Sequence, residues 1–219
     1  MFDRLFNRRS QSERDPANDA QTRRWVVLDT ETTGLNIRHD HVISIAAVAI
    51  HIEPDLRQAH ICLDDTFEVF IRQDRPEVKK DNILIHHIGI DAQEQGSDQV
   101  EVLGDFAAWV GHAPLFAYHA EFDRVMLTKA FKGSSLPELS NPWVDVQPLA
   151  NWATRQIHPL GLDECAARFG LENIVRHQAA SDTFLTAELL LCLLPQIRRV
   201  ASGFSEVQRL AIEHESHRM

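Results

Sequence analysis

Apolar residues along the chain follow strand-like patterns in the first third and mostly helix-like patterns afterwards. Residues 25–28 are all apolar and lead directly into Asp29, which is typical of a strand buried on both faces. Residues 100–110 repeat their apolar side chains at the spacing of a helix with one buried face. These patterns predict strands at 25–28, 41–52, 61–71, 114–118 and 143–146, and helices at 100–110, 122–131, 148–156, 162–169, 180–194 and 204–214.

Acids, glycine and proline interrupt these patterns and indicate where elements break or end. The pair Asp64-Asp65 interrupts the strand predicted at 61–71. Gly133 is expected to end the helix predicted at 122–131. We expect Pro195 to stop the long helix that begins near residue 180, because proline has no N–H to donate to the preceding turn. Three strands followed by alternating strands and helices favour an α/β sheet covered by helices.

Composition places the chain among ordinary globular proteins, with 44% hydrophobic and 25% charged residues. We divide it into a polar arm at 1–23, a compact domain at 24–196 and a helical tail at 197–219. The sequence lacks the ~18 consecutive apolar residues of a membrane helix, and we expect neither a secretion signal nor membrane association. Cys62, Cys165 and Cys192 follow no CxxC spacing, so we interpret them as reduced thiols of a cytoplasmic protein.

The net charge of −10 argues against a protein that coats long duplex DNA, because nonspecific DNA binding usually relies on a basic surface. An acidic chain suits contact with nucleic acid that is local, short and mediated by metal ions. The net charge therefore neither favours nor disfavours a nuclease.

The sharpest chemical feature is Asp29-Thr30-Glu31 at the end of the first predicted strand. Side chains at positions i and i+2 of a strand point to the same face, so the two carboxylates would stand side by side. They repel one another unless a cation joins them. Oxygen ligands of this kind suit Mg²⁺ or Mn²⁺. Alone, such a pair is more often simply two solvated acids at a strand end.

Two later segments add an acid at a predicted helix start. Asp123 lies in the first turn of its helix, where the helix dipole stabilises a negative charge. His177 precedes Asp182 by five residues, which places them roughly 140° apart on a regular helix. For the two to cooperate, His177 must lie before the helix and Asp182 in its early turns. Each segment alone is also compatible with an ordinary helix-start acid or a surface histidine.

Taken together and in order, three segments resemble the exonuclease motifs of the DEDDh group of 3′→5′ exonucleases. They are 28–35 (LDTETTGL), 120–123 (AEFD) and 177–182 (HQAASD), and the stretch at 162–170 is similar to the helix that precedes the third motif. The group includes the proofreading epsilon subunit of bacterial DNA polymerase III and RNase T. The resemblance covers roughly residues 24–194 and implies an RNase H-like fold, a mixed sheet of about five strands flanked by helices.

The resemblance also implies a mechanism with two divalent cations, Mg²⁺ or Mn²⁺. Asp29, Glu31 and Asp182 would hold one cation, and Asp29 would bridge to a second that Asp123 supports. Two such cations stabilise the attacking and leaving oxygens of an in-line displacement. His177 would be the general base for the attacking water, because its ordinary pKa lies near ~6.5. The product would be a nucleoside 5′-monophosphate.

The expected substrate is a single-stranded or frayed 3′ end of a nucleic acid. Backbone N–H groups after the first motif could hold the terminal nucleotide, with a leucine against its base. The second motif departs from the family because Tyr118-His119 stands where His-Asn is common, which puts substrate contacts there in doubt. The candidate substrate-binding residues are Thr32, Thr33, Gly34, Leu35, His86 and His119.

Several alternatives stay open at this point. Only 37 residues follow Asp182, which favours a stand-alone enzyme over a polymerase proofreading subunit. A non-catalytic nucleic-acid-binding module on the same fold is a third interpretation, although all five motif residues are present. A histidine-metal phosphohydrolase is disfavoured because only His86 and His87 are adjacent. A homodimer, and the choice between DNA and RNA, are left open.

Overall fold

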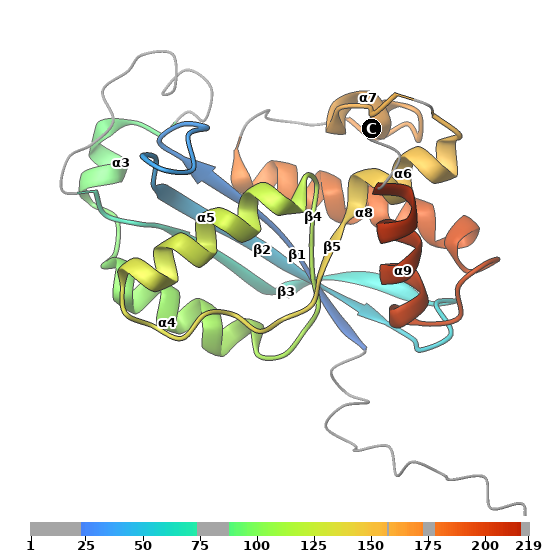
Figure 1. Cartoon of the computed structure of the whole chain (residues 1–219), viewed down its shortest axis with the longest axis horizontal. Coiled ribbons are helices and arrows are strands. Elements are labelled where there is room, and N and C mark those ends of the chain that lie inside the picture. Colours follow the sequence, from blue (N-terminus) through green and yellow to red (C-terminus); the bar gives the residue numbers. More distant parts are fainter. Residues whose placement is uncertain (1–22, 74–87, 157, 173–177, 216–219) are drawn as a thin grey trace, which may run out of the picture.

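A five-stranded mixed sheet lies at the centre of the fold (Figure 1). The computed structural model describes residues 23–73, 88–156, 158–172 and 178–215. The strands are β1 (Arg24–Thr32), β2 (Val42–Ile52), β3 (Ala59–Phe70), β4 (Leu115–Ala117) and β5 (Trp143–Asp145). The helices are α3 (Ile90–Glu94), α4 (Gln99–Val110), α5 (Ala120–Gly133), α6 (Val146–Thr154), α7 (Leu162–Ala167), α8 (Ala179–Ile197) and α9 (Phe204–Glu215).

The strand order β3-β2-β1-β4-β5 combines an antiparallel half with a parallel half. β1, β2 and β3 form a meander of antiparallel neighbours, whereas β4 and β5 run parallel to β1. This arrangement confirms the predicted mixed sheet of about five strands. β1 is central, which explains why it reads as an uninterrupted apolar run: both of its faces are covered.

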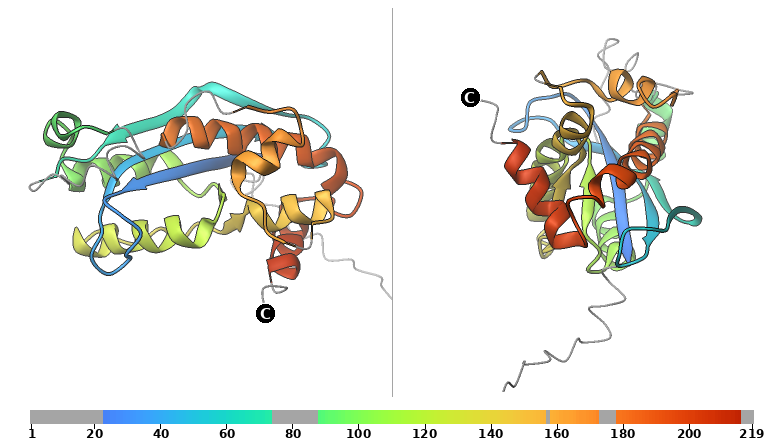
Figure 2. Two further views of the ribbon diagram at one scale, coloured as in Figure 1. Left: turned by 90° about the horizontal axis from the view of Figure 1, so that it is seen from above. Right: turned by 90° about the vertical axis from the view of Figure 1, so that its right-hand side faces the viewer.

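Alternate residues of β1 pack into two separate cores. Trp25 and Val27 join the core under α6, α8 and α9, whereas Val26 and Leu28 join the core under α4 and α5. Each of these four side chains is at most 1% exposed. Figure 2 shows α8 and α5 on opposite sides of the sheet. The odd positions of β1 therefore face α8, which decides where the acids at its end point.

The long helix α8 departs from the prediction at its C-terminal end. It continues through Pro195 to Ile197, so the expectation that Pro195 stops it was wrong. Leu193 and Ile197 on either side of the proline are fully buried, and their packing holds the last turn despite the missing N–H. α8 is long and apolar enough, by length and composition, to span a membrane. Half of this apolar stretch is buried in the fold, so packing against the sheet accounts for its apolar character.

Two other features were not apparent from the sequence pattern. The short helix α3 was not predicted. α9, in the segment expected to be a tail, packs against the sheet: Val207 is fully buried, and Phe204 lies edge-on to Trp25 and Phe116 at ring-centroid distances of 6.1 and 6.2 Å. The described part of this tail thus completes one of the two cores.

Candidate active site

Two acids of β1 and one of α8 meet at the C-terminal end of β1. Asp29 and Glu31 occupy odd positions of the strand, the side that α8 covers. Asp182 lies in the first turn of α8, as the sequence predicted. Carboxylate oxygens of all three residues lie within 4.8 Å of one another. Residues from two distant motifs therefore form one cluster of oxygen ligands.

The fourth acid, Asp123, comes from the other side of the sheet. It lies in the first turn of α5 and is only 3% exposed. The backbone N–H of Thr30 donates to Asp123 Oδ1 at 3.0 Å, and the Thr30 hydroxyl donates to the same oxygen at 2.8 Å. Because Thr30 stands between Asp29 and Glu31, this pair of bonds ties Asp123 to the strand that carries the other acids.

Burial, together with repulsion from neighbouring acids, raises the pKa values of three of these carboxyls. Burial raises the pKa of Asp29 well above its ordinary value, and the charges of Asp123, Glu31 and Asp182 add to the rise. Burial, followed by repulsion from Asp182 and Asp123, raises the pKa of Glu31 to about 8. The pKa of Asp123 rises to about 7 through burial, although the bonds from Thr30 oppose the change.

This electrostatic strain fits a site for divalent cations. Three of these four neighbouring carboxyls have raised pKa values, so all four are ionised together only when positive charge compensates them. The donors are all carboxylate oxygens, which match the preference of Mg²⁺ and Mn²⁺. Asp29, Glu31 and Asp182 could share one cation, because their oxygens already converge.

A further acid at the site, Asp145, was not singled out from the sequence. It ends β5, and its Oδ1 accepts from the N–H of His119 at 3.1 Å and from that of Gln147 at 2.9 Å. Its charge also raises the pKa of Asp123. His119 directly precedes α5 and has a left-handed backbone conformation (φ 65°). Strained conformations of this kind persist only where the surrounding structure holds them, and they cluster at functional sites. The available signal was an acid at a strand end, the same position that Asp29 occupies.

The loop after β1 is organised by its own hydrogen bonds. The Thr33 N–H donates to the carbonyl of His41 at 2.9 Å, and its hydroxyl donates to Asp40 Oδ1 at 3.0 Å. Both groups of Thr33 therefore shape the loop, and the expected contact of Thr33 with substrate stays a prediction. The Thr32 hydroxyl likewise donates to the Gly34 carbonyl at 2.7 Å.

Close packing inside this loop explains its glycine and leaves one apolar side chain outside. A Cβ at Gly34 would lie 2.6 Å from Asp40 Oδ2. Leu35, by contrast, is 85% exposed on the loop that follows β1. Its exposure is consistent with the expected contact to a substrate base. The expected general base His177 and substrate residue His86 lie outside the described residues.

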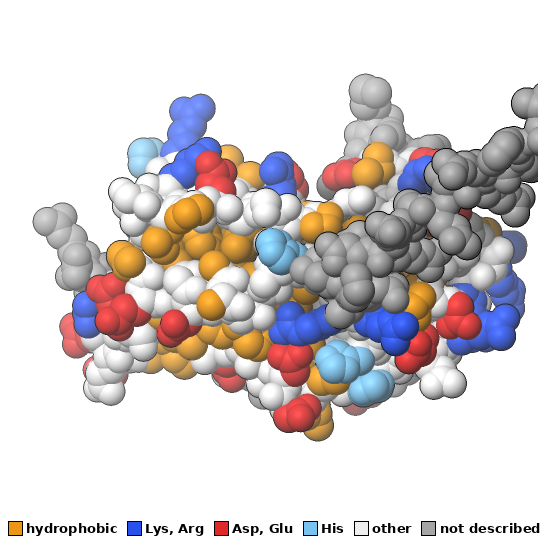
Figure 3. All heavy atoms as spheres, turned by 90° about the horizontal axis from the view of Figure 1, so that it is seen from below, with side chains coloured by type: hydrophobic (Ala, Val, Ile, Leu, Met, Phe, Trp, Pro, Cys, Tyr) orange, Lys and Arg blue, Asp and Glu red, His pale blue; other side chains and the backbone are white. Residues whose placement is uncertain are grey.

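The molecular surface matches the acidic composition. On the face drawn in Figure 3, lysine and arginine side chains form small groups beside aspartates and glutamates instead of a continuous basic strip. Contact with phosphate on this face would therefore be local.

Comparison with known proteins places this geometry in a family. The family model described as the RNase T exonuclease matches residues 26–190. DNA polymerase III PolC-type of Bacillus subtilis is 32% identical over 171 residues, which cover 78% of this chain and 11% of that protein. The Staphylococcus saprophyticus protein of the same name is 29% identical over 82% of this chain and 12% of its own length. The chain thus spans about a tenth of the length of these relatives.

Solved structures with the same fold are also nucleases. Escherichia coli ExoI, in a zinc-bound complex with ssDNA, superposes with a TM-score of 0.65 at 15% identity, covering 81% of this chain and 43% of ExoI. Exonuclease X, bound to duplex DNA with a 5′ overhang, has a TM-score of 0.62 at 20% identity and covers 85% and 99% of the two chains. Because the family model covers most of its length, this chain belongs to the RNase T exonuclease family.

Proposed function

We propose that the chain is a divalent-cation-dependent 3′→5′ exonuclease of the DEDDh type. It hydrolyses the terminal phosphodiester bond at nucleic-acid 3′ ends and releases nucleoside 5′-monophosphates. The observation that carries this proposal is the convergence of the Asp29, Glu31 and Asp182 carboxylates within 4.8 Å, with Asp123 buried behind them. Such a set of acids has no stable ionised state without cations, and structural acids are not usually arranged in this way.

Each acid has a distinct part in this proposal. Asp29, Glu31 and Asp182 would hold one Mg²⁺ or Mn²⁺, and Asp29 with Asp123 would support a second. Bound cations would supply the positive charge that stabilises the attacking and leaving oxygens. Thr30 holds Asp123 through the two hydrogen bonds to its Oδ1 and so keeps it aligned with β1. His177, at the third motif, is the proposed general base that takes the proton of the attacking water.

The substrate is proposed to be a single-stranded or frayed 3′ end. Leu35 would pack against the terminal base, since its side chain is exposed on the loop that follows the acids of β1. Backbone N–H groups of Thr32 and Gly34 would contact the terminal phosphate, and His86 and His119 would border the same pocket. Structural relatives include ExoI with ssDNA and a 3′-exonuclease that recognises a histone mRNA stem-loop (TM-score 0.66, 14% identity). Proteins of this fold therefore include both a DNA-binding and an RNA-binding example.

A second candidate, polymerase proofreading, is favoured by the similarity to PolC-type DNA polymerase III. In that case the chain would act on the frayed 3′ terminus of a primer held by a polymerase. We rank it second and propose that the chain turns over substrate without a partner, because the acids that form the site all come from this chain.

Product analysis on 5′-labelled single-stranded DNA and RNA of equal sequence tests the proposal. With Mg²⁺ or Mn²⁺ we expect a ladder that shortens from the 3′ end, and with EDTA no cleavage. Asp29→Asn is the matched inactive control. Cleavage that requires an added polymerase would favour the proofreading role. An absence of cleavage under every condition, with substrate binding retained, would support a non-catalytic binding module instead.

A further inference from the structure

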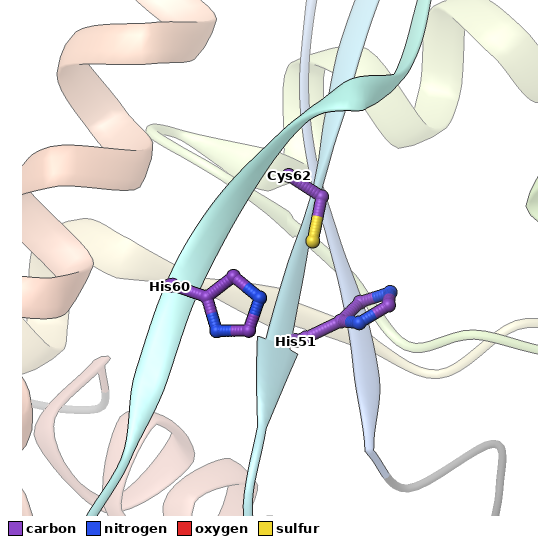
Figure 4. Close-up of side chains that lie close together, drawn as sticks. All are labelled: His51, His60 and Cys62. Atoms are coloured by element: carbon purple, nitrogen blue, oxygen red, sulfur yellow. The ribbon is translucent and has the colours of Figure 1, made fainter.

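Three potential metal ligands meet at the far end of the sheet, away from the acids. His51 on β2 and His60 on β3 are direct partners in the antiparallel register, and Cys62 pairs with Ala49. His51, His60 and Cys62 therefore share one face of the two strands, with Cys62 diagonal to His51. Figure 4 shows that the three side chains lie close together. One donor atom from each lies within 4.8 Å of the other two.

We propose that His51, His60 and Cys62 bind a Zn²⁺ ion. Two imidazole nitrogens and one sulfur form a ligand set that zinc accepts in a tetrahedral site, whereas Mg²⁺ prefers oxygen ligands. On binding, the Cys62 thiol loses its proton to solvent, and its sulfur forms the bond to the ion. His51 and His60 line a surface hollow of about 500 Å³, which leaves the fourth position open to water.

The surroundings of the cluster hold the ligands in place. A bulge in β3 shifts the register between Val48 and Ala49 and lies next to Cys62. In this bulge, Asp65 Oδ2 lies 3.8 Å from His51 Nε2, which places a carboxylate beside one of the proposed ligands. Cys62 itself is only 8% exposed.

The nearby arginine does not leave the site with an uncompensated positive charge. Arg24 donates to both carboxylate oxygens of Asp65, at 2.7 and 2.9 Å, and its guanidinium lies 4.5 Å from the centre of the Trp109 ring. These contacts neutralise the guanidinium and fix its position. The cation would therefore bind two imidazoles and the Cys62 sulfur beside a charge pair that is already balanced.

This site is separate from the exonuclease acids in place and in chemistry. His51 pairs with Arg24 at the start of β1, whereas Asp29 lies five residues further along the strand, about 17 Å away at a rise of ~3.3 Å per residue. The ion would join β2 to the outer strand β3 next to the loop at 53–58 that connects them. A ligand that binds only the folded state stabilises it, so the expected effect is on stability and not on hydrolysis.

Cobalt titration tests the site directly, because Co²⁺ replaces zinc and absorbs in the near ultraviolet when a thiolate binds it. Untagged full-length protein is titrated with CoCl₂ in excess Mg²⁺, which occupies the carboxylates. We expect a thiolate band that saturates at one equivalent and disappears on addition of ZnCl₂. Cys62→Ser should lose the band, while Cys192→Ser, a half-buried cysteine elsewhere, and Asp29→Asn should retain it.

Thermal unfolding gives an independent readout. Stoichiometric ZnCl₂ should raise the midpoint of the parent protein and of Asp29→Asn, but not that of Cys62→Ser or His60→Ala. His60 is exposed, so His60→Ala keeps the test valid if Cys62→Ser fails to fold. Exonuclease activity in Mg²⁺ should be unchanged in both variants. A thiolate band that persists in Cys62→Ser, or a parent protein with no band at all, would overturn the proposal.

Discussion

Thr30 holds Asp123 with two hydrogen bonds to a single carboxylate oxygen, one from its backbone N–H and one from its hydroxyl. The threonine lies between Asp29 and Glu31, so one residue couples the acid of α5 to the acids of β1. The bonds favour the charged form of Asp123 and oppose the effect of burial on its pKa. Alignment and ionisation of the fourth acid thus depend on a residue that is not itself an acid.

Removing the hydroxyl in Thr30→Val should weaken catalysis without removing any carboxylate. A hydrogen bond to a charged group contributes about 1.5–3 kcal/mol, so we expect a loss of roughly tenfold or more in kcat/KM. The pKa of Asp123 should rise further, and more Mg²⁺ should be needed for half-maximal activity. Thr30→Ser keeps the hydroxyl and is the matched control. Equal activity of the valine and serine variants would show that this bond has no catalytic role.

Asp29→Asn should abolish hydrolysis and stabilise the metal-free protein. The acid is the proposed shared ligand of both cations, and loss of such a group costs at least about a thousandfold in rate. Removal of one of four repelling carboxyls should raise the unfolding midpoint in EDTA at pH 8. Hydrolysis rates and thermal unfolding measure the two effects. Full activity in this variant would mean that the site is elsewhere.

Stability of the metal-free protein should fall as pH rises from about 5 to 8. The pKa of Glu31 is raised to about 8 in the folded state, and an unfolded glutamate titrates near ~4.3. The folded protein therefore binds more protons than the unfolded chain, and its stability is lost as these protons leave. We expect a loss of at least about 2 kcal/mol across this interval in denaturant unfolding.

Two controls separate this effect from general acid or base denaturation. Glu31→Gln should remove much of the slope, because the remaining carboxyls of Asp29, Asp123 and Asp182 have one fewer neighbour to repel. Saturating Mg²⁺ should flatten the profile, since a bound cation favours the ionised acids. A metal-free profile that rises with pH over this interval would contradict the assigned pKa shifts.

Leu35→Ala should weaken substrate binding while leaving stability unchanged. The side chain is 85% exposed, so its loss costs the fold little, yet it lies on the loop after the acids of β1, where we propose that a terminal base packs. We expect KM to rise by roughly tenfold, as for the loss of about 1.4 kcal/mol of apolar contact. Leu63→Ala removes another leucine that is 71% exposed, on β3, and should leave KM unaltered. Identical KM values for the two variants would exclude the proposed contact.

Val207→Ala should destabilise the whole domain by about 2 kcal/mol, since it removes two buried methyl groups and leaves a small cavity. Val207 of α9 is fully buried and packs into the core that contains Trp25. Ile212→Ala on the same helix is the control, because that side chain is 57% exposed. Denaturant unfolding compares the two. Equal stabilities would indicate that α9 is dispensable for the core.

The positions of the four acids of the candidate site could be predicted because these residues carry local signals. Asp29 and Glu31 end an apolar strand, and Asp123 and Asp182 open helices, so alternation and helix period place each of them on its element. The contact from Thr30 to Asp123 could not be predicted, because it depends on the position of α5 against β1. Asp145 was missed for the same reason: its partners lie on a neighbouring loop and helix.

The sequence by itself determined the identity and order of the acids, the apolar centre of β1 and the mixed α/β architecture, because these depend on periods of a few residues. Tertiary structure decided which groups meet. The odd face of β1 turns the Asp29 and Glu31 side chains toward Asp182 of α8, and the β2–β3 register sets His51 beside His60. It also kept Pro195 inside α8, since burial of Leu193 and Ile197 outweighs one missing backbone bond. Local preference selects the elements, whereas register and packing between distant segments set the distances on which chemistry depends.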